Sequence, residues 1–383
     1  MPNNAATDLH VCHIISSFRP LVGGAERATE TLCSRLVEQG VDVVVLTRHH
    51  TGLPRFEYIA RIPVHRLGVG GPRWFRSLTF VAHILLWLCL RLRRYPIVHV
   101  QNIDAPLVAG LLARTLLRRK LVVTLQGEQQ IIMRQAMPLG GFRVRLMVRL
   151  AGRFVAITGE SHRQYLKEGV DPRRICDIPN GIDSERFSPP TPQEKQALRG
   201  QLGLPHRVPI VVFAGRLIPL KRVDALLEAC NASRAVTPFL CLIVGDGPER
   251  TRLERLAHQP GLPEAVRFVG QAPDVRPYYQ AADLFVLPST REGLSVALLE
   301  AMACGLCPLV SGLPGNQELV QHGVNGLAFP PHQPGLLSTR LAEVLGDPDL
   351  RRQLGQAARD TIETGFSAEG VAARHRDLYE QLA

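Results

Sequence analysis

The sequence lacks the features of a secreted or membrane-spanning chain. Its first ten residues, MPNNAATDLH, are polar, and the first apolar run, Val11 to Ile15, has only the length of a strand. The longest apolar stretch, LTFVAHILLWLCLRL at residues 78–92, holds fifteen residues. A membrane-spanning helix needs about twenty residues. We therefore expect a cytoplasmic protein without a signal peptide, in which this stretch forms a core or interfacial helix.

The eight cysteines lack the pattern of a disulfide framework or a zinc site. They are scattered, and several lie inside apolar runs, so we expect buried, reduced thiols. The close pair Cys304 and Cys307 has no second pair and no histidines at metal-ligating spacing nearby. No paired-aspartate metal motif is evident either. The sequence therefore predicts no metal site and an activity that is independent of metal ions.

Acidic residues are scarce in the first half of the chain. Residues 1–180 contain 25 Lys and Arg against 12 Asp and Glu, whereas the remainder contains 20 against 22. The basic residues of the amphipathic segment GFRVRLMVRLAGRF are Arg143, Arg145, Arg149 and Arg153. A basic amphipathic helix can bind an anionic membrane surface, and an ordinary solvated face is the alternative. Nucleic acid is not an expected partner, because no aromatic stacking set or nucleic-acid motif accompanies the charge.

Apolar runs of strand length alternate with helical segments along the chain. Their nearly continuous apolar character is typical of parallel strands that are covered on both faces. The expected strands are residues 10–16, 41–47, 97–101, 120–125, 154–158, 175–179, 210–214, 239–244, 267–269, 284–287 and 308–310. The expected helices of the first half are residues 25–39, 78–93, 106–117, 142–151 and 160–168. This alternation predicts two doubly wound α/β domains with parallel sheets.

A proline-rich segment, FSPPTPQ at residues 187–193, marks the expected boundary between the domains. A chain of 383 residues suits two domains of roughly 150–200 residues each. We expect an N-terminal domain at residues 1–187 and a second domain at residues 188–366. Ligands of such sheets lie at the carboxyl ends of the strands, so we expect the ligand site in the cleft between the domains.

Two segments combine the features of a phosphate-binding site. In LVGGAER, residues 21–27, Gly23 and Gly24 let backbone N–H groups approach an anion at a helix start, although glycines are common in such turns. In FAGRLIPLK, residues 213–221, Arg216 follows a strand and Lys221 precedes the next helix. A cation at a helix N-terminus is unfavourable, because the helix dipole is positive at that end, unless an anion is bound nearby. A diphosphate would supply this anion. The alternative is surface ion pairing with Asp224 or a nearby glutamate.

The segment REGLSVALLEAMACG, residues 291–305, contains two glutamates that helix capping does not explain. Ser295 is the candidate N-cap of the helix that follows. The expected anion cradle consists of the backbone N–H groups of Gly293, Leu294 and Ser295. Glu300 can accept hydrogen bonds from a ribose diol, and Glu292 can accept them from a second sugar. Such donors would offset the cost of a carboxylate in apolar surroundings.

These segments resemble those of the retaining glycosyltransferases of family 4. The matching set is LVGGAER, PNGID at residues 179–183, FAGRLIPLK, VGDGP at residues 244–248 and EGLSVALLEAMACG, in the family's order. By itself VGDGP is better interpreted as a tight turn than as a ligand contact. The resemblance covers nearly the whole chain and implies the GT-B fold, with two Rossmann-like domains facing across a cleft. It also implies that a last helix, around residues 367–382, returns to the N-terminal domain.

The resemblance further implies a role for each site residue. Arg216 and Lys221 would hold the diphosphate of a nucleotide diphosphate sugar, and Gly24 would meet the phosphates from the other domain. Glu300 would hold the nucleotide ribose, and Glu292 would hold the transferred sugar. It implies a hexosyltransferase that retains anomeric configuration and needs no cofactor. The expected acceptor is a sugar or a lipid-linked sugar used for surface polysaccharide, lipopolysaccharide or glycolipid.

One residue departs from the family pattern. Many members carry a histidine after the fifth strand, where this chain has Gln126 in the segment TLQGE. Glutamine donates and accepts hydrogen bonds but cannot become cationic. A role that needs an imidazolium is therefore in doubt, while a hydrogen bond to the donor sugar can survive. His99 and Gln101 are nearby candidates, and two alternatives stay open: a non-catalytic nucleotide-sugar-binding homologue and a nucleotide-sugar epimerase.

Overall fold

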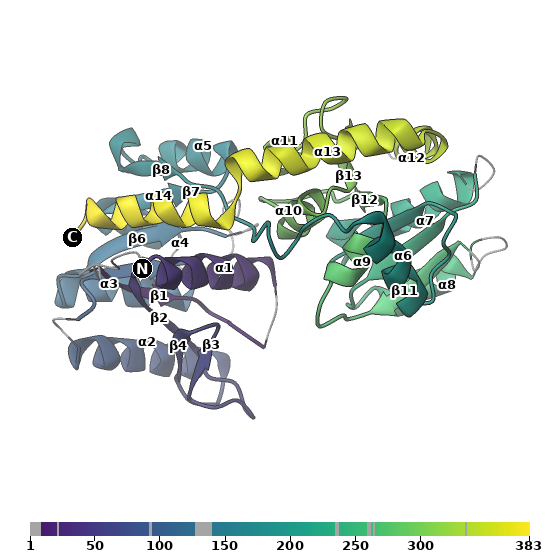
Figure 1. The fold of residues 1–383 in the computed structure, drawn as a ribbon. Helices are drawn as coiled ribbons and strands as arrows, with labels where there is room; N and C mark the ends of the chain where they lie inside the picture. The colour runs from purple at the N-terminus through teal and green to yellow at the C-terminus, as the bar shows by residue number, and fades with distance from the viewer. Residues whose placement is uncertain are drawn as a thin grey trace, which may run out of the picture. The chain divides into compact units, whose positions relative to one another are not determined.

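The chain forms two compact units in the computed structural model (Figure 1). The structure describes residues 9–20, 23–91, 94–126, 140–233, 237–258, 262, 265–333 and 335–383. Unit 1 comprises the chain up to Gly181 together with Ala368–Ala383, and unit 2 comprises Ile182–Ser367. The C-terminal helix α14 (Ala368–Glu380) therefore belongs to the unit that holds the N-terminal half.

Unit 1 is built on an eight-stranded sheet with the strand order β3-β4-β2-β1-β5-β6-β7-β8. Neighbouring strands are parallel, except that the edge strand β3 is antiparallel to β4. The strands are β1 (His10–Ile14), β2 (Asp42–Arg48), β3 (Phe56–Ile59), β4 (Ile62–Leu67), β5 (Ile97–Val100), β6 (Lys120–Thr124), β7 (Arg153–Ala156) and β8 (Ile175–Asp177). The helices besides α14 are α1 (Gly24–Glu38), α2 (Arg73–Cys89), α3 (Ala105–Leu116), α4 (Gly140–Leu150) and α5 (Gly159–Lys167).

The hairpin of β3 and β4 lies outside the strands expected from the sequence. Strand β4 alternates buried and half-buried residues, but Arg66 occupies one of the buried positions and breaks the apolar pattern. Its guanidinium lies 2.5 Å from Glu57 Oε1 and donates to the Pro54 carbonyl at 3.1 Å. Helix α2 also begins at Arg73, ahead of the expected start at Leu78. A buried charge with local partners thus hides the strand period in the sequence.

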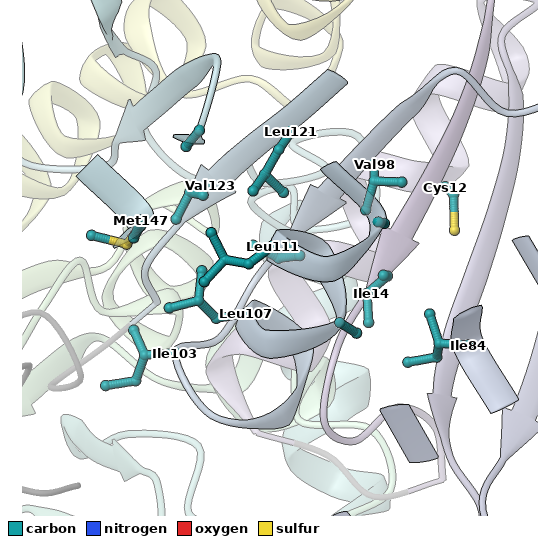
Figure 2. Packing of buried hydrophobic residues seen from close by; sticks show 14 of the residues in the cluster. Cys12, Ile14, Ile84, Val98, Ile103, Leu107, Leu111, Leu121, Val123 and Met147 are labelled. Atoms are coloured by element: carbon teal, nitrogen blue, oxygen red, sulfur yellow. The ribbon is translucent and has the colours of Figure 1, made fainter. Parts of the chain in front are cut away.

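The apolar core of unit 1 lies between the sheet and the helices α2, α3 and α4. Alternate residues of the central strands, among them Ile14, Val98 and Leu121, meet Leu107 of α3 and Met147 of α4 in one continuous cluster (Figure 2). Full burial of each such side chain contributes about 1.5–3 kcal/mol. This layer fixes the strands and therefore the loops that leave their carboxyl ends.

The opposite face of the same strands carries a buried polar cluster against α14. His99 Nδ1 lies 2.7 Å from the Tyr379 hydroxyl, and His99 Nε2 lies 2.7 Å from Thr124 Oγ1. Burial lowers the pKa of His13 to about 3 and that of His375 to about 4, and it lowers the pKa of His99 well below the usual value. The three rings are therefore neutral at pH 7. Helix α14 lies beside α1 (Figure 1) and is held to unit 1 partly through these uncharged rings.

Unit 2 is built on a six-stranded, entirely parallel sheet with the order β11-β10-β9-β12-β13-β14. The strands are β9 (Ile210–Ala214), β10 (Leu240–Val244), β11 (Val266–Gly270), β12 (Leu284–Leu287), β13 (Cys307–Ser311) and the unexpected β14 (Leu327–Phe329). The helices are α6 (Pro192–Gln201), α7 (Val223–Ser233), α8 (Arg250–Ala257), α9 (Arg276–Ala281), α10 (Val296–Ala303), α11 (Pro314–Gln317), α12 (Gly335–Gly346) and α13 (Pro348–Gly365). The prediction of two doubly wound α/β domains is confirmed.

The neutral histidines predict that acid destabilises the protein. A histidine with a lowered folded-state pKa takes up its proton more readily in the unfolded state. Its contribution to stability is therefore present above pH 6.5 and is lost as the pH falls toward 4. We expect the calorimetric unfolding temperature to fall between pH 7 and pH 5. The His375→Leu variant removes one titrating group and should show a smaller fall, whereas an equal fall would assign the effect to other groups.

Candidate active site

The strand order of unit 2 makes β9 and β12 the topological switch point of its sheet. The chain proceeds from β9 to β10 on one side and later enters β12 on the other. Ligands of doubly wound sheets bind beyond the carboxyl ends of the strands at such a point. The loop after β9 spans residues 215–222 and the loop after β12 spans residues 288–295. The fold thereby brings Arg216, Lys221 and Glu292 to one edge of the sheet.

A salt bridge joins these two loops. Lys221 Nζ lies 2.6 Å from Glu292 Oε1, and the Ser289 hydroxyl donates to the same oxygen at 2.5 Å. The backbone N–H of Thr290 also donates to the Leu220 carbonyl at 2.9 Å. The side chains of Lys221 and Glu292 are only 21% and 8% exposed, so the charges are partly shielded from water. The ion pair therefore holds the two loops in one arrangement.

Arg216 lies in the same loop as Lys221 but is exposed to solvent. Within the described residues, its guanidinium makes no hydrogen bond or ion pair. Asp224, one alternative partner for Lys221, instead pairs with Arg222 at 3.1 Å. Lys221 itself pairs with Glu292, whose side chain is only 8% exposed, and not with a surface carboxylate next to it in the sequence. One cation of the pair expected to bind phosphate is thus accessible, and the other is engaged by Glu292.

Backbone N–H groups at the start of α10 form the second element of the site. In the part of the chain that the structure describes, Gly293, Leu294 and Ser295 donate no hydrogen bond to another backbone group. Ser295 caps the helix as predicted, because its hydroxyl accepts from the Leu298 N–H at 3.4 Å. Unpaired N–H groups at a helix N-terminus attract anions. The cradle expected from the sequence therefore has the donors that a phosphate needs.

Glu300 is buried within α10, with 2% of its surface exposed. Its Oε2 accepts a hydrogen bond from the Tyr279 hydroxyl at 3.2 Å. Tyr279 belongs to α9 and lies 21 residues earlier in the sequence. Sequence reasoning missed this donor, because no local pattern links the two helices. The contact holds one oxygen of the carboxylate in place.

The loop after β13 supports the loop that carries Glu292. The Ser311 hydroxyl donates to the Ser289 carbonyl at 2.6 Å, and Asn316 Nδ2 donates to the Ser311 carbonyl at 2.8 Å. Both polar side chains are fully buried. A Cβ on Gly315 would lie 2.1 Å from the Gly293 carbonyl oxygen, so the backbones of the two loops touch. Sequence reasoning missed these residues, and Gly315 is the one local signal that a close approach is required.

The VGDGP turn packs its glycines against the loop after β9. Gly245 has φ +139°, and a Cβ there would lie 1.9 Å from the Gly215 carbonyl oxygen. A Cβ on Gly247 would lie 2.3 Å from the Leu217 carbonyl oxygen. Close backbone approach therefore requires both glycines, which agrees with the tight-turn interpretation. The turn acts on the site by positioning the loop that carries Arg216.

In unit 1, Gly23 and Gly24 lie at the start of α1, where Gly23 is the N-cap. A Cβ on Gly23 would lie 2.5 Å from Glu26 Oε2, so this carboxylate covers the helix N-terminus. A negative charge at this position is favoured by the helix dipole. A phosphate bound to the same N–H groups would have to displace Glu26.

Gln126 is held in a buried polar cluster at the end of β6. Its Nε2 donates to Asn180 Oδ1 at 3.1 Å and to Gln101 Oε1 at 3.2 Å. Asn180 Nδ2 returns a hydrogen bond to Gln126 Oε1 at 3.0 Å. Both amide hydrogens of Gln126 are therefore engaged inside the protein. His99 is fully buried and both of its ring nitrogens are hydrogen-bonded within the protein, which indicates a structural role. Residues 127–128 of TLQGE lie outside the described residues.

Comparison with known proteins identifies the family. The model described as glycosyl transferases group 1 matches residues 194–361, and the model described as glycosyltransferase family 4 matches residues 22–186. The two matches together cover most of both units, and the chain belongs to this glycosyltransferase family.

Individual relatives give the same assignment. The D-inositol 3-phosphate glycosyltransferase 2 of Catenulispora acidiphila is 32% identical over 249 residues, which cover 61% of this chain and 57% of the relative. A GDP-mannose-dependent monoacylated alpha-(1-6)-phosphatidylinositol monomannoside mannosyltransferase of Corynebacterium glutamicum is 35% identical over 213 residues, covering 53% and 55%. The chain thus spans little more than half the length of these curated relatives.

A solved structure extends the likeness over both units. Sucrose-phosphate synthase from Thermosynechococcus elongatus matches with a TM-score of 0.83 and 25% identity, over 98% of this chain and 99% of that one. The chain has the GT-B fold, as the resemblance implied.

Replacing Gly245 by alanine should disturb the site through the backbone. The added Cβ would overlap the Gly215 carbonyl oxygen and occupy a φ that side chains rarely adopt. We expect the free energy of unfolding, measured in urea, to fall by about 1–3 kcal/mol. Gly346→Ala is the matched control, since a Cβ there meets no atom within 4 Å. Equal stability of the two variants would contradict the close approach.

Proposed function

We propose that this protein is a retaining glycosyltransferase that moves a sugar from a nucleotide diphosphate sugar to an acceptor. One observation carries the proposal. At the switch point of unit 2, an accessible Arg216 and three unpaired N–H groups accompany the Lys221–Glu292 ion pair. Cations and amides of this kind suit a diphosphate, and a carboxylate beside them suits sugar hydroxyls.

Arg216 and the N–H groups of residues 293–295 hold the donor diphosphate in this proposal. Arginine is always charged and can grip phosphate oxygens with two parallel hydrogen bonds. Lys221 adds a second positive charge on the same side. Glu300 accepts the two ribose hydroxyls, with its carboxylate steadied by Tyr279. In unit 1, Gly23 and Gly24 offer further backbone N–H groups for a phosphate once the Glu26 carboxylate has moved.

Glu292 orients the transferred sugar in this mechanism. Its Oε1 already accepts from Lys221 and Ser289, whereas Oε2 accepts no hydrogen bond from the described residues and remains for a sugar hydroxyl. Departure of the nucleotide adds negative charge to the diphosphate, which Arg216, Lys221 and the α10 amides stabilise. Since no covalent nucleophile is evident, we propose retention by a front-face path through an oxocarbenium-like state. Gln126, whose two amide hydrogens already bond Asn180 and Gln101, keeps only a lone pair on its amide oxygen for a substrate hydroxyl and supplies no positive charge.

We propose a lipid-linked or otherwise membrane-associated acceptor, used for surface polysaccharide, lipopolysaccharide or glycolipid. Two facts support this proposal. The Corynebacterium relative is named for action on a phosphatidylinositol mannoside, and the first half of this chain carries all of its net positive charge. A peripheral position on an anionic membrane surface would bring unit 1 to such an acceptor.

Substitution of the two glutamates should separate binding from turnover. We expect Glu300→Ala to lose most of the thermal stabilisation that the preferred nucleotide among UDP, GDP and ADP gives to the wild type. A ligand at a hundredfold excess over Kd stabilises the folded state by ~2.7 kcal/mol. Glu292→Ala should keep this stabilisation but lose at least a hundredfold in kcat for sugar transfer. Full activity of Glu292→Ala would refute its role, and binding without any transfer by the wild type would favour the non-catalytic alternative.

Metal chelation should leave the activity unchanged. The positive charges of Arg216 and Lys221 and the α10 N-terminus supply the stabilisation that a divalent cation gives in other transferases. We expect equal initial rates of transfer in EDTA and in magnesium. Activity that EDTA abolishes and magnesium restores would overturn this mechanism.

A further inference from the structure

Helix α2 is apolar on both of its long faces. Its inner face, which includes Phe80, Ile84 and Leu88, is fully buried in the core of unit 1. Its outer face exposes large apolar side chains at helical spacing. Their exposed fractions are 69% for Trp74, 37% for Phe75, 60% for Leu78, 57% for Leu86 and 73% for Leu90. Scattered apolar surface residues are common, but a continuous stripe of this size marks an interaction surface.

The sequence segment that carries the stripe has charge of a single sign. No Asp or Glu occurs between Glu57 and Asp104, a stretch that contains the whole of α2. Arg73 and Arg76 are exposed in the first turn of the helix. At the other end, the Arg91 guanidinium lies 4.3 Å from the centroid of the buried Trp87 ring. The outer face therefore combines an uncharged apolar stripe with arginines at its ends.

These features fit an anionic lipid surface. An amphipathic element lying in the membrane interface buries an apolar face among acyl chains while basic residues meet the headgroups. Tryptophan is a preferred residue at that depth. The alternative orientation, across the bilayer, is not open to α2, because no helix within the described ranges is long and apolar enough to cross. A second protein copy would also cover apolar surface, but it would face the same like-charged arginines of its partner.

We propose that the outer face of α2 inserts into the interface of anionic membranes and docks unit 1 there. The inference deepens the proposed use of a membrane-associated acceptor and rests on that proposal for its biological purpose. Its physical basis, the exposed stripe and its arginines, is independent of the donor site. Helix α4, with the exposed Arg145 and Arg149, adds charge but exposes little beyond Phe142 that could insert.

Trp74 allows insertion to be observed directly. The chain has two tryptophans, and the other, Trp87, is only 8% exposed. We expect vesicles of phosphatidylcholine with phosphatidylglycerol to shift the emission of the full-length protein to shorter wavelength. Lipids brominated on their acyl chains should quench it. Vesicles of phosphatidylcholine alone should have a much smaller effect, and Trp74→Phe should abolish most of the response.

Vesicle sedimentation separates insertion from simple attraction of charge. The Leu78→Ser/Leu86→Ser variant keeps every arginine and should bind anionic vesicles at least tenfold more weakly. Leu166→Ser changes a leucine on α5 that is 41% exposed, and it should bind as the wild type does. Arg145→Gln/Arg149→Gln should weaken binding moderately without changing the Trp74 shift at saturation.

Other results would overturn the proposal. The proposal would be wrong if the wild type bound no vesicles. It would also be wrong if the Leu78→Ser/Leu86→Ser variant bound vesicles as tightly as the wild type. A dimer in light scattering that this variant dissociates, without vesicle binding, would assign the face to a second copy. Thermal stabilisation by nucleotide, measured in the same variants, tests the donor site separately. If vesicle binding is intact but no nucleotide stabilises the protein, the result counts against the proposed function and not against this surface.

Discussion

The ion pair between Lys221 and Glu292 is the interaction on which the candidate site depends. It links the loops after β9 and β12, which leave adjacent strands, and it acts together with the Thr290–Leu220 backbone hydrogen bond. A buried pair of this kind costs desolvation that the attraction only partly repays, so it contributes little to overall stability. Its effect is to fix one lysine and one carboxylate in relation to the α10 N-terminus. A diphosphate bound there as proposed would meet charges whose positions are already set.

Backbone contact makes this arrangement rigid. Gly245 and Gly247 allow one turn to touch the loop that carries Arg216, and Gly315 allows another to touch the loop that carries Glu292. The four loops at this edge of the sheet therefore support one another through main-chain atoms, which have little freedom to move. Preorganisation of this kind would reduce the ordering cost of binding the proposed donor. It also explains why short glycine turns accompany the charged residues.

Much of this was predictable from the sequence, for identifiable reasons. The switch-point strands are continuous apolar runs, and Arg216, Lys221, Glu292 and Glu300 follow or flank them within short, regular distances. The sequence could not predict that Lys221 pairs with Glu292, because the two residues lie 71 positions apart. The support of Glu300 by Tyr279 was hidden for the same reason. Strand β4 was missed because its buried Arg66 interrupts an otherwise regular alternation.

The neutral histidines of unit 1 bear on Gln126, the position at which the resemblance implies a histidine in many relatives. Three imidazoles on the α14 side of the sheet have pKa values far below normal because burial disfavours their charged form. Gln126 is itself 7% exposed and bonded to Gln101, whose amide lies 3.3 Å from His13. Burial of this kind would disfavour the charged form of an imidazole at position 126. In hydrogen-bonding capacity, a glutamine that donates and accepts resembles a neutral histidine more closely than an imidazolium.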